Sequence, residues 1–265
     1  FSMVLLWDQW QIYNGHKPTF FPTPPKAEAT APSAAGTTPP ANASGVPAAA
    51  PVAGQATAVP GSAQASTAVA RERIEVRTDV LKLSFDSEGA SLVRTEFLKH
   101  EDAHRQGAPV ALLDESKERV YLAQSGLIAG PAGGNFPTHK TAMRVLAGER
   151  TLQEGQDSMT LQFESAAVDG VKLLKTFTFK RGAYDMSVKH EVVNGSNAPV
   201  APQLYLQLVR DGNKPEGESS FYSTFTGPAV YTGTKKYQKF EFTDIEKGKA
   251  EFEKQSNDGY IAMVQ

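Results

Sequence analysis

The segment His100-Glu101-Asp102-Ala103-His104 carries the sharpest chemical motif of the chain, because it matches H-E-x-x-H. On a helix, two histidines four residues apart share one face and can hold zinc, with the glutamate as general base. The context is against such a helix, since a predicted strand precedes the motif and Gly107 and Pro109 follow it. No third ligand is placed among the other histidines, which are His16, His139 and His190. We therefore predict a polar loop without a metal, and a zinc metalloprotease stays the third hypothesis, to be tested by metal analysis.

Nucleophilic and acid–base sites are also weakly represented. The chain has no G-x-S-x-G sequence and no cysteine, which excludes a thiolate nucleophile and a disulfide framework. The acidic pairs Asp114-Glu115 and Glu164 with Asp169 fall in predicted turns, where carboxylates are common. The glycine-rich stretch from Gly126 to Gly134 lacks the Lys-Ser/Thr of a phosphate loop, so we expect a mobile surface loop. No catalytic residue, cofactor or metal is predicted.

Aromatic residues gather late in the chain, with lysines between them. The aromatic members are Phe221, Tyr222, Phe225, Tyr231, Tyr237, Phe240 and Phe242, and the lysines are Lys235, Lys236 and Lys239. A surface that binds sugars or peptides could have this composition. Strands with rings packed inward and lysines outward would give the same pattern, and we favour that interpretation.

The overall composition limits the class of partner. The 265 residues are 40% hydrophobic and 21% charged, and the formal net charge is −2. No basic surplus points to nucleic acid. Without the low-complexity stretch that precedes Arg71, roughly 195 residues remain, which is enough for one sizeable core.

From Arg71 onward the chain has the pattern of successive strands. Apolar and polar residues alternate with period two, which is typical of half-buried strands. The predicted strands lie around Ile74 to Val76, Leu81 to Phe85, Leu92 to Leu98, Arg119 to Leu122, Thr141 to Leu146, Met159 to Phe163, Lys172 to Lys180, Tyr184 to Val193 and Val200 to Val209. Turn signals separate the later runs at Asp169-Gly170, Arg181-Gly182 and Asn194-Gly195, and three adjacent strands joined by tight turns predict an antiparallel meander.

These strands predict an all-β domain, most simply a large antiparallel sandwich over residues 71–265. The final apolar run, Tyr260 to Gln265, has the pattern of a strand with nothing after it. Because natural domains avoid an unpaired hydrophobic edge, we expect the sandwich to be incomplete at its C-terminal end.

Residues 14–70 predict a disordered spacer. From Ala29 to Ala70 the sequence has no charged or aromatic residue and is rich in alanine, proline and glycine. Such a segment cannot bury enough apolar surface to offset its ordering entropy. As a coil of about 50 residues it would span roughly 40 Å.

Residues 1–13 predict the outer end of a transmembrane helix. The anchor residues are Val4, Leu5, Leu6, Trp7 and Trp10. The apolar run is too short to span a bilayer, which takes about 20 residues, so we expect that the start of the helix is missing. The tryptophans fit the headgroup level, where aromatic side chains collect. A buried helix end is the alternative.

Several segments together resemble the YidC membrane protein insertases of Gram-negative bacteria. They are Val76-Arg77-Thr78-Asp79-Val80-Leu81 with Gly89, Tyr121 to Leu127, Lys175 to Tyr184, Phe225 to Tyr231 and Gly259 to Gln265. The N-terminal Leu-Leu-Trp-Asp-Gln-Trp and its Ala/Pro tether are similar to the first transmembrane helix of that family and its exit into the periplasm. The resemblance runs along the whole chain.

The resemblance implies a periplasmic β-supersandwich similar to galactose mutarotase, carried by a multi-pass protein of the bacterial inner membrane. Members of that family insert and fold integral membrane proteins, alone or with the Sec translocon, in a groove formed by later transmembrane helices. The expected partners are therefore inner-membrane lipid, nascent membrane proteins and Sec translocon components, and the sandwich is expected to be a non-enzymatic docking or chaperone module. No groove residue lies in this chain, and the position of any ligand cleft in the sandwich is unknown.

A membrane-tethered carbohydrate-binding or mutarotase-like domain is the second hypothesis. It predicts that His139 or His190 lies beside a carboxylate in a deep pocket. The similarity of fold alone says nothing firm about sugar use.

Overall fold

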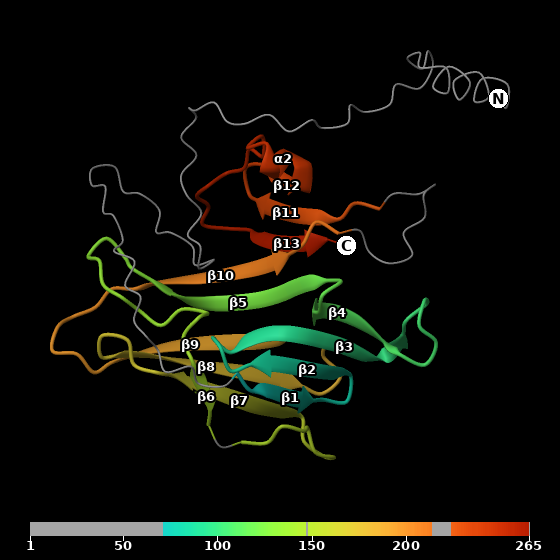
Figure 1. Ribbon diagram of the computed structural model, residues 1–265, viewed down its shortest axis with the longest axis horizontal. Helices are drawn as coiled ribbons and strands as arrows, with labels where there is room; N and C mark the ends of the chain where they lie inside the picture. The colour runs from blue at the N-terminus through green and yellow to red at the C-terminus, as the bar shows by residue number, and fades with distance from the viewer. Residues whose placement is uncertain (1–70, 147, 214–223, 265) are drawn as a thin grey trace, which may run out of the picture. The chain divides into compact units, whose positions relative to one another are not determined.

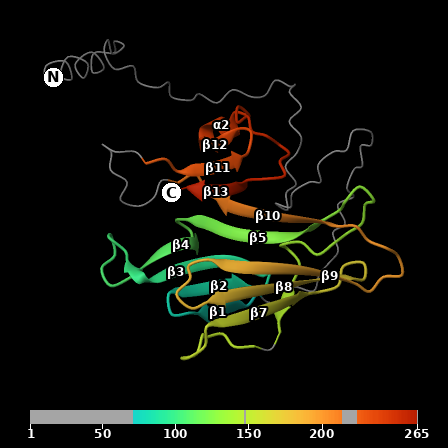
Figure 2. The same cartoon turned by 180° about the vertical axis from the view of Figure 1, so that it is seen from behind.

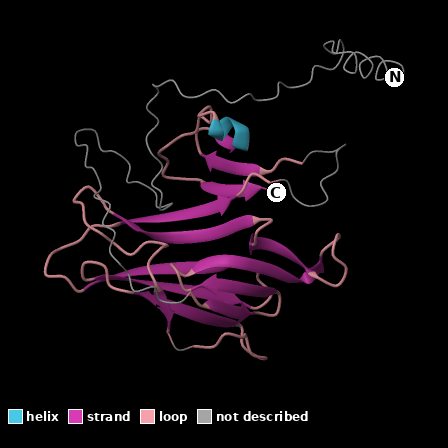
Figure 3. Cartoon of the chain, in the orientation of Figure 1, coloured by secondary structure: helices cyan, strands magenta, loops and turns pink. Residues whose placement is uncertain are grey.

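The computed structural model describes residues 71–146, 148–213 and 224–264. These residues form antiparallel β-structure in three sheets, and the only helix among them is the five-residue α2. Figure 1 follows the elements along the chain, Figure 2 shows the reverse side and Figure 3 separates strands from loops. The predicted all-β sandwich is confirmed, while its likeness to galactose mutarotase stays a prediction.

The first sheet has six strands in the order β1–β2–β3–β4–β5–β10. They are β1 (Arg73–Arg77), β2 (Leu81–Asp86), β3 (Ser91–Glu101), β4 (Pro109–Glu115), β5 (Val120–Ile128) and β10 (Gln203–Arg210). Neighbouring strands are antiparallel throughout. Direct pairing of β3 with β5 is restricted to Leu92 and Ala123, and on one side of this point β4 pairs with both strands.

The second sheet is the predicted meander. Its order is β6–β7–β8–β9, with β6 (Met143–Val145), β7 (Ser158–Ser165), β8 (Val171–Lys180) and β9 (Met186–Asn194). Asp169 and Gly170 both have positive φ, and Val168 and Val171 exchange backbone hydrogen bonds around them. This is the backbone that a two-residue hairpin requires, and it confirms the turn predicted from Asp-Gly.

The two sheets bury their facing sides against each other. On β8 every second residue is buried, as the alternation predicts for a strand with one face toward the core. The ring of Phe177 in β8 lies 4.7 Å, between centroids, from the tilted ring of Phe85 in β2, and 5.8 Å from the ring of Phe163 in β7, which it meets edge-on. Aromatic side chains from both sheets thus form the centre of one shared core.

The β3–β4 hairpin corrects one sequence prediction. His100 and Glu101 belong to the end of β3, where a loop was expected, and the unpredicted strand β4 begins at Pro109. Proline is tolerated at the first position of a strand, where its missing N–H costs little. The apolar residues that follow Pro109 then add a strand to the sheet. The sequence did not predict this strand, because Pro109 and the nearby Gly107 suggested a loop.

The turn at Asn194-Gly195 does not make a hairpin. The Asn194 side chain closes a local turn, in which its Nδ2 donates to the Ala198 carbonyl. The chain then crosses to the other sheet, where β10 pairs with β5 along eight residues. Asn-Gly predicted the turn correctly, but the partner of the next strand was wrong, because pairing is decided by which edge remains open.

A third sheet of three strands, β12–β11–β13, follows. Its elements are β11 (Gly227–Thr232), β12 (Lys236–Lys239) and β13 (Tyr260–Val264), with α2 (Phe242–Glu246) in the connection. The strand predicted from the final apolar run is confirmed as β13. The helix has no buried residue, so its packing contributes little to the fold.

Candidate functional site

Lys175 lies buried between the two large sheets. It occupies the inward phase of β8, between Leu173 and Phe177, so the strand turns its side chain toward the opposing sheet. Its Nζ donates hydrogen bonds to the carbonyl oxygens of Gly89, at 2.6 Å, and Ser125, at 2.7 Å. Burial lowers the pKa of Lys175 from 10.5 to about 7, because the charged amine loses its water.

The two acceptors lie where the sheet hydrogen bonding is interrupted. Gly89 is in the turn between β2 and β3, and Ser125 lies in β5 just past the point where pairing with β3 ends. A buried carbonyl without a donor is costly. Lys175 therefore supplies, from the other sheet, the donor that a neighbouring strand would have given.

His190 extends this polar cluster on β9. It is directly opposite Lys175 in the β8–β9 register, so both side chains lie on the same face of the sheet. Its Nε2 is 2.8 Å from the hydroxyl oxygen of Ser125. Burial, with a smaller effect of Lys175, lowers the pKa of His190 to about 4, so the ring is neutral at pH 7.

His139 is held by Tyr205 of β10. The His139 backbone N–H donates to the phenol oxygen at 2.9 Å, and its Nδ1 is 2.6 Å from the same oxygen. Gly126 leaves the room for this contact, since a Cβ there would lie 2.6 Å from the Tyr205 hydroxyl. Burial first, then Lys140 and Lys175, lower the pKa of His139 to about 4.

The chemistry of this cluster is that of a structural contact. A working Ser–His pair needs a third group that orients the imidazole and donors for an oxyanion, and a nucleophilic lysine needs access to substrate. In the described part of the chain, His139 and His190 each contact a hydroxyl group, and neither has a carboxylate partner. Lys175 is fully buried. The arrangement required by the carbohydrate hypothesis is therefore not found among these residues.

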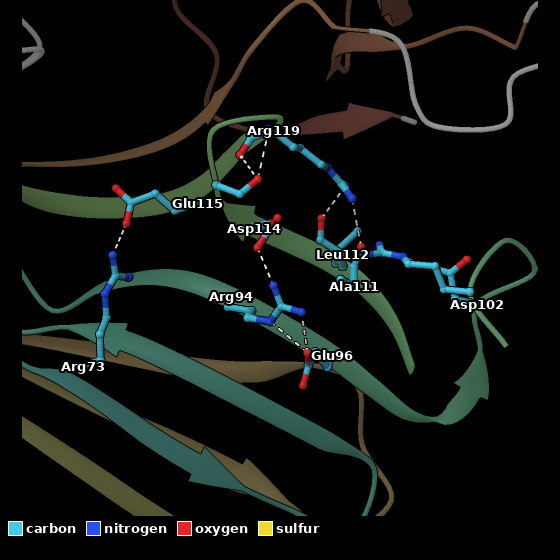
Figure 4. A network of polar contacts seen from close by, with 11 residues as sticks. Arg73, Arg94, Glu96, Asp102, Ala111, Leu112, Asp114, Glu115 and Arg119 are labelled. Atoms are coloured by element: carbon cyan, nitrogen blue, oxygen red, sulfur yellow. Dashed lines mark hydrogen bonds and ion pairs between the residues drawn. The ribbon is translucent and has the colours of Figure 1, made fainter. Parts of the chain in front are cut away.

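A charged network lies at β3 and β4 (Figure 4). Arg94 donates to Glu96 at 2.6 and 2.8 Å and to Asp114 at 2.5 Å, which links the two strands. Arg119 donates to the carbonyls of Ala111, at 3.1 Å, and Leu112, at 2.7 Å. The Arg94 side chain is 41% exposed, and solvent-exposed pairs of this kind contribute roughly 0–1 kcal/mol each. The network supports the local strand arrangement.

The H-E-x-x-H motif does not form a metal site. The His100 ring lies tilted against Tyr184, with its Nε2 3.1 Å from the Tyr184 hydroxyl, and the His104 backbone N–H donates to the Asp102 carboxylate at 2.8 Å. The motif thus spans a strand end and a turn, and no helix places the two histidines on one face. Across the described ranges no group of three His, Asp or Glu could hold a metal ion.

The late aromatic cluster is divided between packing and solvent. Tyr231 stacks on Tyr260 with centroids 5.3 Å apart, and the Lys239 ammonium lies 4.9 Å from the centre of the Phe225 ring. Tyr237 is 47% exposed, so the expectation that the rings pack inward is wrong for this residue. Phe221 and Tyr222 lie outside the described residues.

The anchor residues Val4, Leu5, Leu6, Trp7 and Trp10 also lie outside the described residues, as do the linker and residues 1–13. No helix in residues 71–146, 148–213 or 224–264 has the length and apolar character needed to cross a membrane. The anchor therefore stays a sequence prediction.

The buried cluster was missed at the level of sequence, although one signal was available. Lys175 is the one polar residue on the inward-facing side of β8. The other residues on that side are Val171, Leu173, Phe177 and Phe179. A lysine in that phase must be buried with acceptors or shift the strand register. Its acceptors could not be found from sequence, since both are backbone carbonyls of the other sheet.

Comparison with known proteins agrees with the resemblance. The relatives include the membrane protein insertase YidC of Bordetella petrii, 46% identical over 267 residues, which cover all of this chain and 47% of that protein. The insertases of Bordetella avium, at 48%, and Ralstonia nicotianae, at 46%, also match over the whole chain. The chain thus spans about half the length of these relatives. The family model of the YidC periplasmic domain matches residues 73–265, and the chain belongs to this family.

Proposed function

We propose that this chain is part of an inner-membrane insertase that inserts and folds integral membrane proteins. The match of residues 73–265 to the YidC periplasmic domain carries the proposal. The relatives that match the whole chain are insertases by name, and each is about twice as long. The insertion step is assigned to the parts of the protein outside these 265 residues.

The sandwich serves as a non-catalytic docking or chaperone module on the periplasmic side. Its buried Lys175, His139 and His190 are bound to carbonyl and hydroxyl groups, which supports a structural role for this basic cluster. Its partners would be nascent membrane proteins, inner-membrane lipid and components of the Sec translocon.

The organisation of the chain follows from this function. Residues 1–13 would belong to a transmembrane helix, residues 14–70 would form a flexible tether, and residues 71–265 would form the periplasmic sandwich domain. The alanine- and proline-rich composition of the tether supports a spacer that lets the domain reach partners away from its anchor.

Complementation tests the proposal. In cells depleted of their own insertase, the full-length protein is expected to restore insertion of a reporter inner-membrane protein, measured by protease protection. Deletion of residues 71–265 is expected to retain insertion but to weaken co-purification of partner proteins. Failure of the full-length protein to restore insertion would contradict the assignment, and unchanged co-purification after the deletion would contradict the docking role.

A further inference from the structure

One of the segments that cross between the two large sheets is held by two backbone hydrogen bonds. Residues 129–142 link β5 to β6. The Pro137 carbonyl accepts the Leu127 amide of β5 at 2.9 Å, and the Thr141 carbonyl accepts the Gly89 amide at 2.8 Å. His139 lies between these two points, with 2% of its surface exposed. The connection is therefore bound to β5 at one point and to the turn between β2 and β3 at the other.

The contact between His139 and Tyr205 favours a neutral imidazole. The phenol oxygen already accepts the His139 backbone N–H at 2.9 Å. In a neutral imidazole that carries its hydrogen on Nε2, Nδ1 is an acceptor. The Tyr205 hydroxyl can then donate its proton to Nδ1, which lies 2.6 Å from the phenol oxygen. When Nδ1 is protonated, two donors face the phenol oxygen, and the phenol proton loses its acceptor.

The surroundings amplify the effect of that proton. The groups facing the cluster are Lys175 from β8, His190 from β9, Tyr205 from β10 and Lys140 beside His139 on the connection. Three of them are basic. Burial raises the pKa of Tyr205, so the phenol does not provide a counter-charge at neutral or acidic pH. None of the hydrogen bonds found for Lys175, His139 or His190 in the described residues involves a carboxylate.

We propose that the His139–Tyr205 contact is an acid-released clasp, which holds residues 129–142 against β5 and the turn between β2 and β3, and which frees them when the imidazole is protonated. The clasp is local. The hairpins of the four-stranded sheet do not depend on this contact, so they keep their hydrogen bonds when the connection opens.

Amide hydrogen exchange tests the clasp on the 265-residue chain. Three backbone amides are the reporters. Those of Gly89 and Leu127 donate to carbonyls of the connection, and that of Met143, the residue that follows the connection, donates to the Ser87 carbonyl. The pKa of His139 is about 4 in the closed state against an ordinary 6.5, so proton uptake accompanies opening between these values. After correction for intrinsic exchange, opening is expected to rise by up to about tenfold per pH unit, and by about 80-fold in total from pH 6.5 to pH 4.

Variants separate the clasp from general acid unfolding. In His139→Gln the pH dependence at the three reporters is expected to vanish, while His190→Gln and the exposed-site control His100→Gln retain it. Tyr205→Phe is expected to raise opening at every pH, because the phenol that holds the connection is lost. Amides inside the β7–β8 hairpin should not follow the reporters.

Three results would overturn the proposal. The first is a tenfold-per-unit dependence that survives in His139→Gln. The second is a uniform response in which the β7–β8 amides open together with the reporters. If His139→Gln does not fold, NMR titration of the His139 imidazole in the unmodified chain decides the matter, and an ordinary pKa near 6.5 would be the third contradicting result.

Discussion

Lys175 shows how one residue can join two sheets without an ion pair. It donates to two carbonyls at 2.6 and 2.7 Å, and its neutral form has the two N–H groups that these acceptors need. The folded state thus favours the neutral amine, with a pKa of about 7, whereas the unfolded chain holds the proton up to about pH 10.5. Between these values the unfolded state binds more protons, so stability rises with pH and is lost as pH falls toward 7.

Replacement of this lysine is predicted to remove that pH dependence. The free energy of unfolding of the unmodified chain should rise by up to about 1.4 kcal/mol per pH unit between pH 7 and pH 9. Lys175→Met should be flat in the same window, as measured by urea unfolding at pH 7, 8 and 9. Lys180→Met, at the exposed end of β8, is the matched control and should keep the slope. A slope that persists in Lys175→Met would contradict the assignment.

At the scale of elements, β8 organises the core. Its inward residues meet aromatic side chains of both sheets, and Phe177 contacts Phe85 and Phe163. Phe177→Ala is predicted to destabilise the domain by about 3–5 kcal/mol, since it removes a buried ring and leaves a cavity. Thr178→Ala, one position away on the opposite face, should cost less than about 1 kcal/mol. Equal losses of stability in urea unfolding would contradict the assignment of the two faces.

Strand positions were largely predictable, and strand partners were only partly so. Alternation located β1, β2, β7 and β8, because one face of each strand is buried. β4 was hidden by Pro109, and the partner of β10 depends on the free edge of β5, which no local pattern encodes. Turn residues indicate where the chain bends. Which strands then pair with each other depends on the packing of the whole domain.

The buried site was less predictable than the strands for the same reason. His139 and His190 were recognised as isolated histidines, but their partners Tyr205 and Ser125 lie 66 and 65 residues away. Such contacts arise only when the two sheets pack. The resemblance to the YidC family supplied the functional class, which neither alternation nor any local motif could provide.

At the scale of the whole molecule, we propose that the sandwich serves for docking and that its buried polar cluster is structural. The full-length protein would then keep its insertion activity after loss of the Ser125–His190 contact, provided that the domain stays folded. A catalytic pair would not tolerate it, because removal of a nucleophile or its base typically costs several orders of magnitude in rate.

The most direct test is the insertion activity of the full-length protein that carries both Ser125→Ala and His190→Gln. Reporter insertion in insertase-depleted cells would be measured by protease protection, and folding of the domain by circular dichroism of the purified protein. The account predicts insertion within about twofold of the unmodified protein. Loss of insertion by an order of magnitude or more, in a protein whose sandwich remains folded, would contradict it.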